Sequence, residues 1–99
     1  MKRYLLTGPA REDIREIMAY LRARSPTAAT RVRQKLRGAM RRLAEIPGLG
    51  HLRADLADIP IRFLAVYAYL ILYDPDTRPV RILRALHGAR NVKQLLEEG

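Results

Sequence analysis

The sequence contains no cysteine, and its aromatic residues are few, with five Tyr and one Phe. Without cysteine the 99-residue chain can form neither a disulfide framework nor a thiolate metal site. Long hydrophobic runs are also missing. The longest uncharged one, Phe63 to Tyr73, has 11 residues, whereas a transmembrane helix needs about 20. No secretory signal pattern is visible either. We therefore expect one small cytoplasmic domain that does not cross a membrane.

Several functional motifs are absent as well. The chain has no glycine-rich phosphate-binding loop, no H-E-x-x-H zinc motif and no G-x-S-x-G nucleophile motif. No residues show the paired spacing of metal ligands. We therefore expect no cofactor and no bound metal.

Basic residues dominate the charge. The chain has 19 Lys and Arg against 10 Asp and Glu, which gives a net charge of +9, and only three of the basic residues are lysine. Arginine presents a planar fork that fits carboxylates and phosphates. This balance favours an anionic partner, either a nucleic acid or an acidic protein. A codon bias toward arginine would produce the same excess, so the charge predicts the sign of the partner and not its identity.

Two amphipathic helices are predicted in the first half of the chain. The first should run from about residue 9 to residue 24, with Glu12 and Asp13 in its first turn, where acidic side chains complement the helix dipole. Ser25 and Pro26 form a cap and a first-turn proline that begin the second helix. Its apolar stripe consists of Ala29, Val32, Leu36, Ala39, Met40 and Leu43. Helices joined so closely should form an antiparallel hairpin.

Four short strands are predicted around these helices. They are Lys2 to Thr7, Ile61 to Val66, Tyr69 to Asp74 and Val80 to Leu86. A turn near Tyr67 and Ala68 should join the second and third strands, although it lacks the glycine or asparagine of common two-residue turns. The predicted fold class is α+β, with the helical hairpin lying on a small, mostly antiparallel sheet.

Both faces of the predicted sheet are apolar. Alternation along the last strand places Val80, Ile82 and Leu86 on one face and Leu83 on the other. An antiparallel sheet with one face in water should alternate apolar and polar residues. The helical hairpin covers one face, so we expect a partner polypeptide to cover part of the other.

The order of elements, β-α-α-β-β-β, and the last strand running into His87-Gly88-Ala89-Arg90-Asn91 together resemble the ParE/RelE superfamily of toxins from type II toxin–antitoxin systems. The resemblance covers nearly the whole chain as a single domain over residues 1–99. The tail looks most like the ParE, or plasmid-stabilisation, branch. The resemblance implies a growth-inhibiting toxin that acts on DNA gyrase. It also implies a hetero-oligomer with an acidic antitoxin, encoded by an adjacent gene, that holds the toxin inactive.

Two alternatives to a ParE-like toxin remain. RelE-like relatives are ribosome-dependent mRNA endoribonucleases, often with a tyrosine near the C-terminus. This chain has no tyrosine after Tyr73, so its tail lacks an aromatic platform for stacking a base. A protein of the same fold can also be a non-toxic binding module. The resemblance therefore favours a ParE-like toxin that is not itself an enzyme.

Arg84, His87 and Arg90 are the predicted target-binding residues, and they are the catalytic candidates if the chain is a nuclease. Arg84 interrupts an apolar strand, where an unpaired charge is costly. It either grips an anion or is an edge-strand arginine whose head reaches solvent. His87 either acts as a general base or bonds a backbone carbonyl and shapes the turn before Gly88.

The second helix carries Arg31, Lys35 and Arg42 opposite its apolar stripe. This face either docks DNA, ribosomal RNA or an acidic antitoxin, or it is a solvated surface that steers an anionic partner. Together with Leu83 on the last strand, these three residues are the predicted antitoxin-binding residues.

Overall fold

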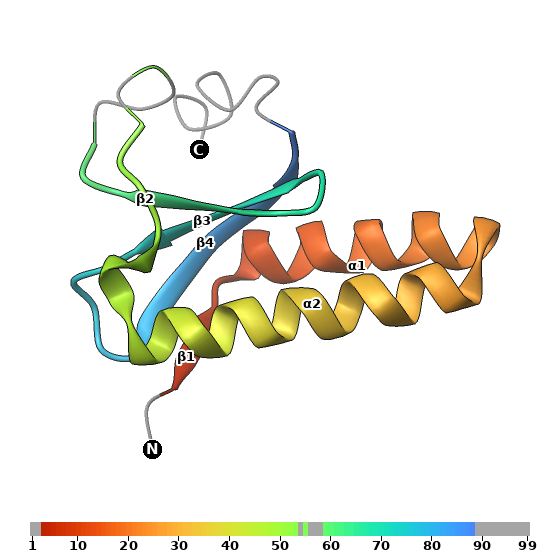
Figure 1. The fold of residues 1–99 in the computed structure, drawn as a ribbon, viewed down its shortest axis with the longest axis horizontal. Coiled ribbons are helices and arrows are strands. Elements are labelled where there is room, and N and C mark those ends of the chain that lie inside the picture. Colours follow the sequence, from red (N-terminus) through yellow and green to blue (C-terminus); the bar gives the residue numbers. More distant parts are fainter. Residues whose placement is uncertain (1–2, 54, 56–58, 89–99) are drawn as a thin grey trace.

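The structure is a computed structural model, and it describes residues 3–53, 55 and 59–88. The helices are α1 (Gly8–Arg24) and α2 (Pro26–Glu45), followed by the short 3-10 helix η1 (Pro47–Leu49). The strands are β1 (Tyr4–Leu6), β2 (Arg62–Val66), β3 (Tyr69–Asp74) and β4 (Val80–His87). The two helices lie side by side as a hairpin against the sheet (Figure 1).

The four strands form one sheet in the order β1-β4-β3-β2. β1 runs parallel to β4, whereas β3 is antiparallel to both of its neighbours. β1 and β2 therefore form the two edges. The predicted α+β fold with a mostly antiparallel sheet is confirmed.

Thr7 connects β1 to α1. Its hydroxyl lies 2.9 Å from the carbonyl oxygen of Ile82 and 3.1 Å from that of Leu83, and it donates toward both. The same oxygen accepts a hydrogen bond from the Ala10 N–H at 3.4 Å. Thr7 thus caps the helix while it continues the contact between β1 and β4. Thr7 therefore caps α1 just after the end of β1 and does not form the last residue of the predicted strand.

The start of α1 differs from the prediction, whereas the start of α2 agrees with it. α1 starts at Gly8 and has no acidic residue in its first turn, so the placement of Glu12 and Asp13 there was wrong. α2 starts as predicted, because the Ser25 hydroxyl accepts a hydrogen bond from the Ala28 N–H at 3.2 Å and Pro26 follows the cap.

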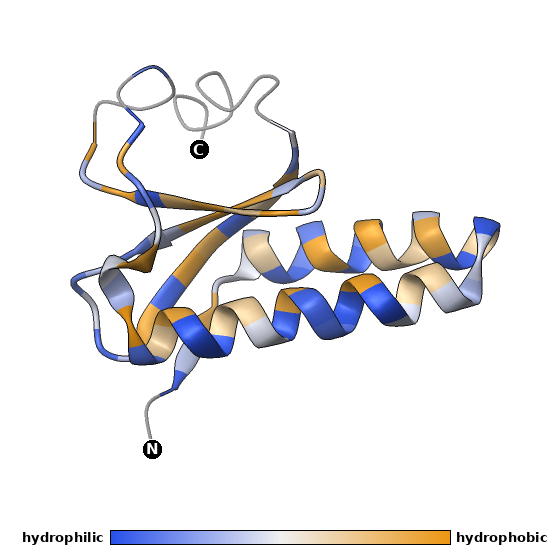
Figure 2. Cartoon of the chain, in the orientation of Figure 1, coloured by the Kyte–Doolittle hydropathy of each residue, from blue (hydrophilic) through white to orange (hydrophobic). Residues whose placement is uncertain are grey.

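The main core lies between the helical hairpin and the sheet. Its buried members come from both helices and from β3 and β4: Ala10, Met18, Leu36, Ala39, Met40, Leu43, Tyr69, Ile71, Tyr73, Val80 and Ile82. Hydrophobic and hydrophilic segments alternate along both helices (Figure 2), as expected for helices that bury one side. Each fully buried leucine here contributes about 1.5–3 kcal/mol of burial free energy.

The opposite face of the sheet carries a second buried cluster. It contains Ile61, Phe63, Leu70, Leu72 and Leu86, with Leu83 half-buried against them. Leu72 is 0% exposed and Leu86 only 9%. The expectation that a partner must cover this face was therefore wrong, since these side chains are already buried within the chain.

Leu86 lies on the other face from the one predicted. The pairing of β3 with β4 shifts register between Leu72 and Tyr73, and such a bulge interrupts the alternation of side chains. Ile82 consequently belongs to the main core, while Leu86 pairs with Leu70 and joins the second cluster.

Tyr73 ties the end of α2 to the sheet. Its hydroxyl donates to the Pro47 carbonyl oxygen at 2.7 Å and accepts from the Gly50 N–H at 2.8 Å. Burial raises the pKa of this phenol, so the hydroxyl keeps its proton. A Cβ on Gly50 would lie 2.7 Å from the Tyr73 hydroxyl oxygen and 2.8 Å from the Phe63 carbonyl oxygen. Only glycine fits this position without displacing backbone.

The turn between β2 and β3 is made by Tyr67 and Ala68, as predicted. Tyr67 has a φ of 55°, a left-handed backbone conformation that residues other than glycine rarely adopt. The Ala68 carbonyl accepts a hydrogen bond from the Gly88 N–H at 2.7 Å, and Gly88 has a φ of 70°. The turn is therefore held against the end of β4.

Gly50→Ala should lower the free energy of unfolding by about 1–3 kcal/mol, because the added methyl group overpacks the contact with Tyr73. Gly48→Ala is the matched control. A Cβ at Gly48 meets nothing within 4 Å, so the change should stay within about 0.5 kcal/mol. Urea unfolding followed by circular dichroism measures both. Equal effects of the two substitutions would contradict the close approach at Gly50.

Candidate functional site

Asp13 and Arg84 join α1 to β4. The Arg84 Nε and Nη2 donate to the two carboxylate oxygens of Asp13 at 2.7 and 2.9 Å. The backbone N–H of Ala85 donates to the same carboxylate at 3.0 Å. The side chains are 25% and 12% exposed, so this bidentate pair is shielded from most of the solvent. The hydrogen bonds that Arg84 donates to the Asp13 carboxylate raise the pKa of the guanidinium.

Arg84 lies beyond the part of β4 that pairs with β1, because that pairing ends at Ile82. Its head group is held by Asp13 and does not extend freely into solvent. The guanidinium is bound by a carboxylate of its own chain, so an external anion would have to compete with Asp13. Arg84 therefore acts first as a structural tie between a helix and a strand.

His87 lies at the end of β4 and is exposed. Its ring packs edge-on against Tyr69, with 5.4 Å between the ring centroids and 72° between the planes. Among the described residues, none forms a hydrogen bond with the imidazole, so none of them supplies the ring-to-carbonyl bond of the second reading. The Gly88 N–H bond to Ala68 holds the following turn.

His87 and Tyr69 line a hollow of about 470 Å³ together with Glu16, Ile17 and Tyr20 of α1. Tyr20 is 56% exposed, and the Arg24 guanidinium stacks 3.7 Å above its ring. Burial raises the pKa of Tyr69. Sequence reasoning selected His87 but missed its tyrosine neighbours, because they come from α1 and β3.

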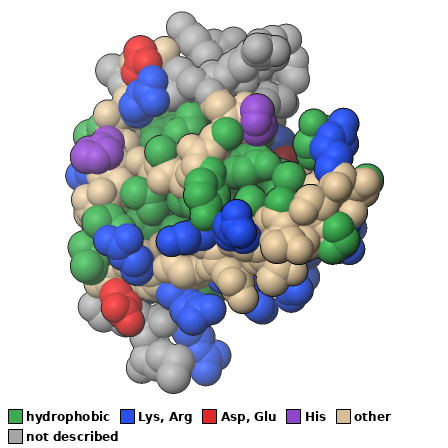
Figure 3. All heavy atoms as spheres, turned by 45° about the vertical axis from the view of Figure 1, so that its right-hand side comes forward, with side chains coloured by type: hydrophobic (Ala, Val, Ile, Leu, Met, Phe, Trp, Pro, Cys, Tyr) green, Lys and Arg blue, Asp and Glu red, His purple; other side chains and the backbone are tan. Residues whose placement is uncertain are grey.

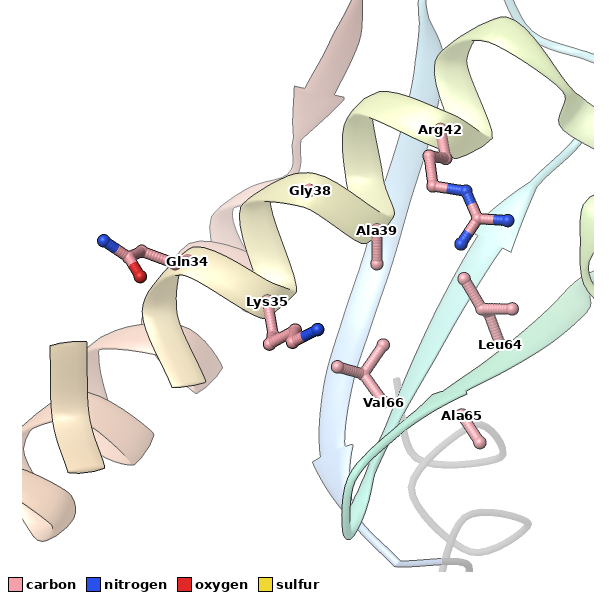
Figure 4. A pocket seen from close by; sticks show the side chains of 8 residues that line it. All are labelled: Gln34, Lys35, Gly38, Ala39, Arg42, Leu64, Ala65 and Val66. Atoms are coloured by element: carbon pink, nitrogen blue, oxygen red, sulfur yellow. The ribbon is translucent and has the colours of Figure 1, made fainter. Parts of the chain in front are cut away.

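Lys35 and Arg42 of α2 line a groove of about 460 Å³ beside β2. In Figure 4 both side chains extend toward β2, and Leu64 and Val66 point back toward the helix, whereas Ala65 points away from it. The face drawn in Figure 3 carries a broad area of hydrophobic side chains bordered by Lys and Arg. The groove thus combines cations with an apolar wall.

The outer edge of β2 is partly open. Phe63 exchanges two backbone hydrogen bonds with His51, at 2.9 and 2.8 Å, on the side away from β3. Because alternate residues of a strand direct their N–H and C=O groups the same way, those of Ala65 also point outward. No described residue pairs with them. An extended peptide can add to such an edge.

The other predicted residues are not gathered at this groove. Arg31 is exposed on α2 one turn before Lys35 but does not line the groove. Leu83 is half-buried in the cluster on the opposite face of the sheet. Arg90 lies outside the described residues.

Neither a membrane span nor a metal cluster occurs among the described residues. No described helix is long and apolar enough to cross a bilayer. No group of three or more His, Cys, Asp or Glu in the described ranges is arranged to hold a metal ion.

Arg84→Ala should lower the free energy of unfolding by about 1–3 kcal/mol, because it leaves a mostly buried carboxylate with only one backbone donor. Arg81→Ala, at an exposed position of the same strand, should change it by less than about 0.5 kcal/mol. Urea unfolding of both variants measures the difference. An Arg84 variant as stable as the Arg81 control would show that the ion pair contributes nothing to the fold.

Comparison with known proteins bears on the whole chain. The chain resembles a solved structure described as "Chromosomal ParDE TA system from P. aeruginosa", with a TM-score of 0.69 and 20% identity, over 89% of this chain and 97% of that one. At this identity the likeness shows the fold alone. No individually curated protein matches the sequence. The profile of the family described as "ParE toxin of type II toxin-antitoxin system, parDE" matches residues 4–92.

That match takes in every helix and strand described above, from β1 through β4. It also extends beyond β4 into the segment with the His-Gly-x-Arg pattern noted in the sequence. The chain therefore belongs to the ParE toxin family of type II toxin–antitoxin systems.

Proposed function

We propose that this toxin is neutralised by an acidic antitoxin, of which an extended segment binds in the groove between α2 and β2. The observation that carries the proposal is the open edge of β2 at Ala65, flanked by Lys35 and Arg42. Backbone hydrogen bonds to the edge supply affinity, and the side chains beside it select the sequence of the added strand.

The groove residues fit such a segment in charge and in polarity. Lys35 and Arg42 attract carboxylates, and their long-range field raises the rate of association. Leu64 and Val66 are half-buried on β2, so apolar side chains of the added strand gain contact with them. A second contact along the outer surface of α2, at Arg31, is compatible with an acidic helix. Leu83 lies on the opposite face of the sheet and does not line this groove.

Ala65→Pro is the sharpest test of strand addition. Proline removes the outward N–H of β2 but leaves the pairing with β3 intact, because an edge strand tolerates proline when its N–H faces solvent. Capture of the co-expressed antitoxin should fall by about tenfold or more. Ala65→Val, which keeps the N–H, is the matched control and should retain binding. Equal capture by both variants would contradict strand addition.

Charge reversal tests the cations separately. Lys35→Glu combined with Arg42→Glu should weaken antitoxin binding by about tenfold to a hundredfold, mainly through slower association. Arg33→Glu combined with Arg37→Glu makes the same change of net charge on the other side of α2 and should have a smaller effect. Binding kinetics at two salt concentrations measure both. Similar losses of antitoxin affinity in the two double variants would show that the cations act through the net charge of the chain and not through the groove.

We further propose that the target of the free toxin is DNA gyrase and that the surface around His87 contacts it. Family membership and the hollow beside His87, with its exposed Tyr20, support this choice. Partly exposed tyrosines beside a hollow are typical of energetically important contact sites. Arg84 contributes by holding β4 in place, and Arg90 remains part of the proposed surface on sequence grounds.

A ribosome-dependent endoribonuclease is the second candidate. The observation in its favour is the hollow that His87 shares with the exposed Tyr20, since a histidine beside an exposed aromatic ring provides a base and a stacking surface at one place. The tie between Arg84 and Asp13 weighs against it, because that guanidinium is not free to stabilise a phosphorane.

His87→Gln separates the two candidates. Glutamine retains hydrogen-bonding groups but does not exchange protons at neutral pH, so a gyrase inhibitor should keep most of its toxicity. Induction without antitoxin should trap gyrase on DNA and activate the DNA-damage response, with mRNA intact. Cleavage of translated mRNA that disappears in the His87→Gln variant would establish the nuclease. Normal growth with the wild-type chain, confirmed as expressed, would identify a non-toxic binding module.

A further inference from the structure

The cations of α2 fall on two separate sides of the helix. Lys35 and Arg42 face β2, as described above. Arg33 and Arg37 lie on the other side, beside α1 and β1. A hollow of about 360 Å³ is lined by Arg33 together with Arg22 of α1, and a second of about 140 Å³ is lined by Arg33 together with Arg37. Because Arg33 borders both hollows, the three arginines form one continuous basic track.

We propose that this track binds the phosphate backbone of double-stranded DNA. Arg33, Arg37 and Arg41 recur at every fourth residue of α2 and extend the track by one turn. The rise of an α-helix places the first and last about 12 Å apart along the axis. Duplex DNA carries one charge for about every 1.7 Å of its axis, so a row of this length spans several phosphates.

Among the described residues, no carboxylate is paired with the arginines of the track. Arg22, Arg33, Arg37 and Arg41 are all exposed, and none of them forms an ion pair within the described residues. No Asp or Glu lines either hollow. These guanidinium groups are therefore available to an anion, in contrast with that of Arg84.

The surroundings of the track favour a nucleic acid over an acidic protein. A protein partner needs apolar side chains to anchor it. The apolar residues that line the smaller hollow include Leu36 and Met40, which are 2% and 3% exposed and belong to the core. Leu6 and Ile14 also line it, and both are half-buried and packed against the same core. The β2 side of the helix, with its half-buried Leu64 and Val66 and its open strand edge, offers the features that a peptide requires.

The same surroundings favour a duplex over a single strand. Single-stranded nucleic acids bind by stacking bases on exposed aromatic rings. Among the described residues that line the two hollows, the one aromatic side chain is that of Tyr4, which is half-buried. Arginine contacts to phosphates need no base, so the binding should be independent of sequence.

Fluorescence anisotropy of the full chain with a labelled random-sequence duplex tests the proposal. Wild-type protein should bind with a dissociation constant of about 1–100 µM near physiological salt, and the affinity should fall steeply between about 50 and 200 mM salt. Arg33→Gln combined with Arg37→Gln should weaken binding on the order of tenfold and make the salt slope shallower by about two. Circular dichroism of each variant checks the fold.

Lys35→Gln combined with Arg42→Gln is the charge-matched control and should change the affinity much less. Equal losses of duplex affinity in the two double variants would overturn the proposal and indicate general electrostatic attraction. Stronger binding to a single-stranded RNA of the same length, or no binding to the duplex at low salt, would also overturn it. The assay contains neither gyrase nor antitoxin, so its outcome is independent of the proposed function.

Discussion

The carboxylate of Asp13 fixes the helical hairpin to the sheet at the place where β1 ends. β1 pairs with β4 only as far as Ile82, and beyond that point the edge of β4 needs other partners. The Thr7 hydroxyl donates toward the carbonyl oxygens of Ile82 and Leu83. The Asp13 carboxylate accepts hydrogen bonds from the Ala85 N–H and from the Arg84 guanidinium. The start of α1 thus completes the edge that the short first strand leaves unfinished. At the β2 edge of the sheet, no described residue pairs with the outward N–H and C=O of Ala65, so this part of the edge has no such completion within the described ranges.

Local signals in the sequence predicted most of the fold. Ser25 and Pro26 mark the junction of the helices because capping chemistry is confined to a few neighbouring residues, and the apolar stripe of α2 follows from its period. The contacts that organise the site are of another kind. Asp13 and Arg84 lie 71 positions apart, and neither residue type identifies its partner. The bulge that moves Leu86 to the other face depends on how β3 and β4 pair, which is a property of two strands and not of one.

The two sides of α2 have different neighbours and therefore different chemistry. Toward β2 the cations border half-buried apolar residues and an open backbone edge, a combination suited to a peptide. Toward α1 and β1 the arginines border hollows that no Asp or Glu lines and whose large apolar side chains belong to the core or pack against it, a combination suited to phosphates. An excess of nine positive charges is thus divided by the fold into distinct surfaces. Sequence reasoning recognised Arg31, Lys35 and Arg42 as a group, but the position of β2 was needed to separate the groove from the track.

The central claim is that Asp13 and Arg84 act as one structural unit. A double-mutant cycle of Asp13→Ala and Arg84→Ala, measured by urea unfolding, tests it most directly. If the pair holds α1 on β4, removing the second partner should cost little once the first is gone, and the coupling free energy should be about 1–3 kcal/mol. Additive effects of the two substitutions, with a coupling below about 0.3 kcal/mol, would contradict the account and leave Arg84 free to serve as an anion-binding residue.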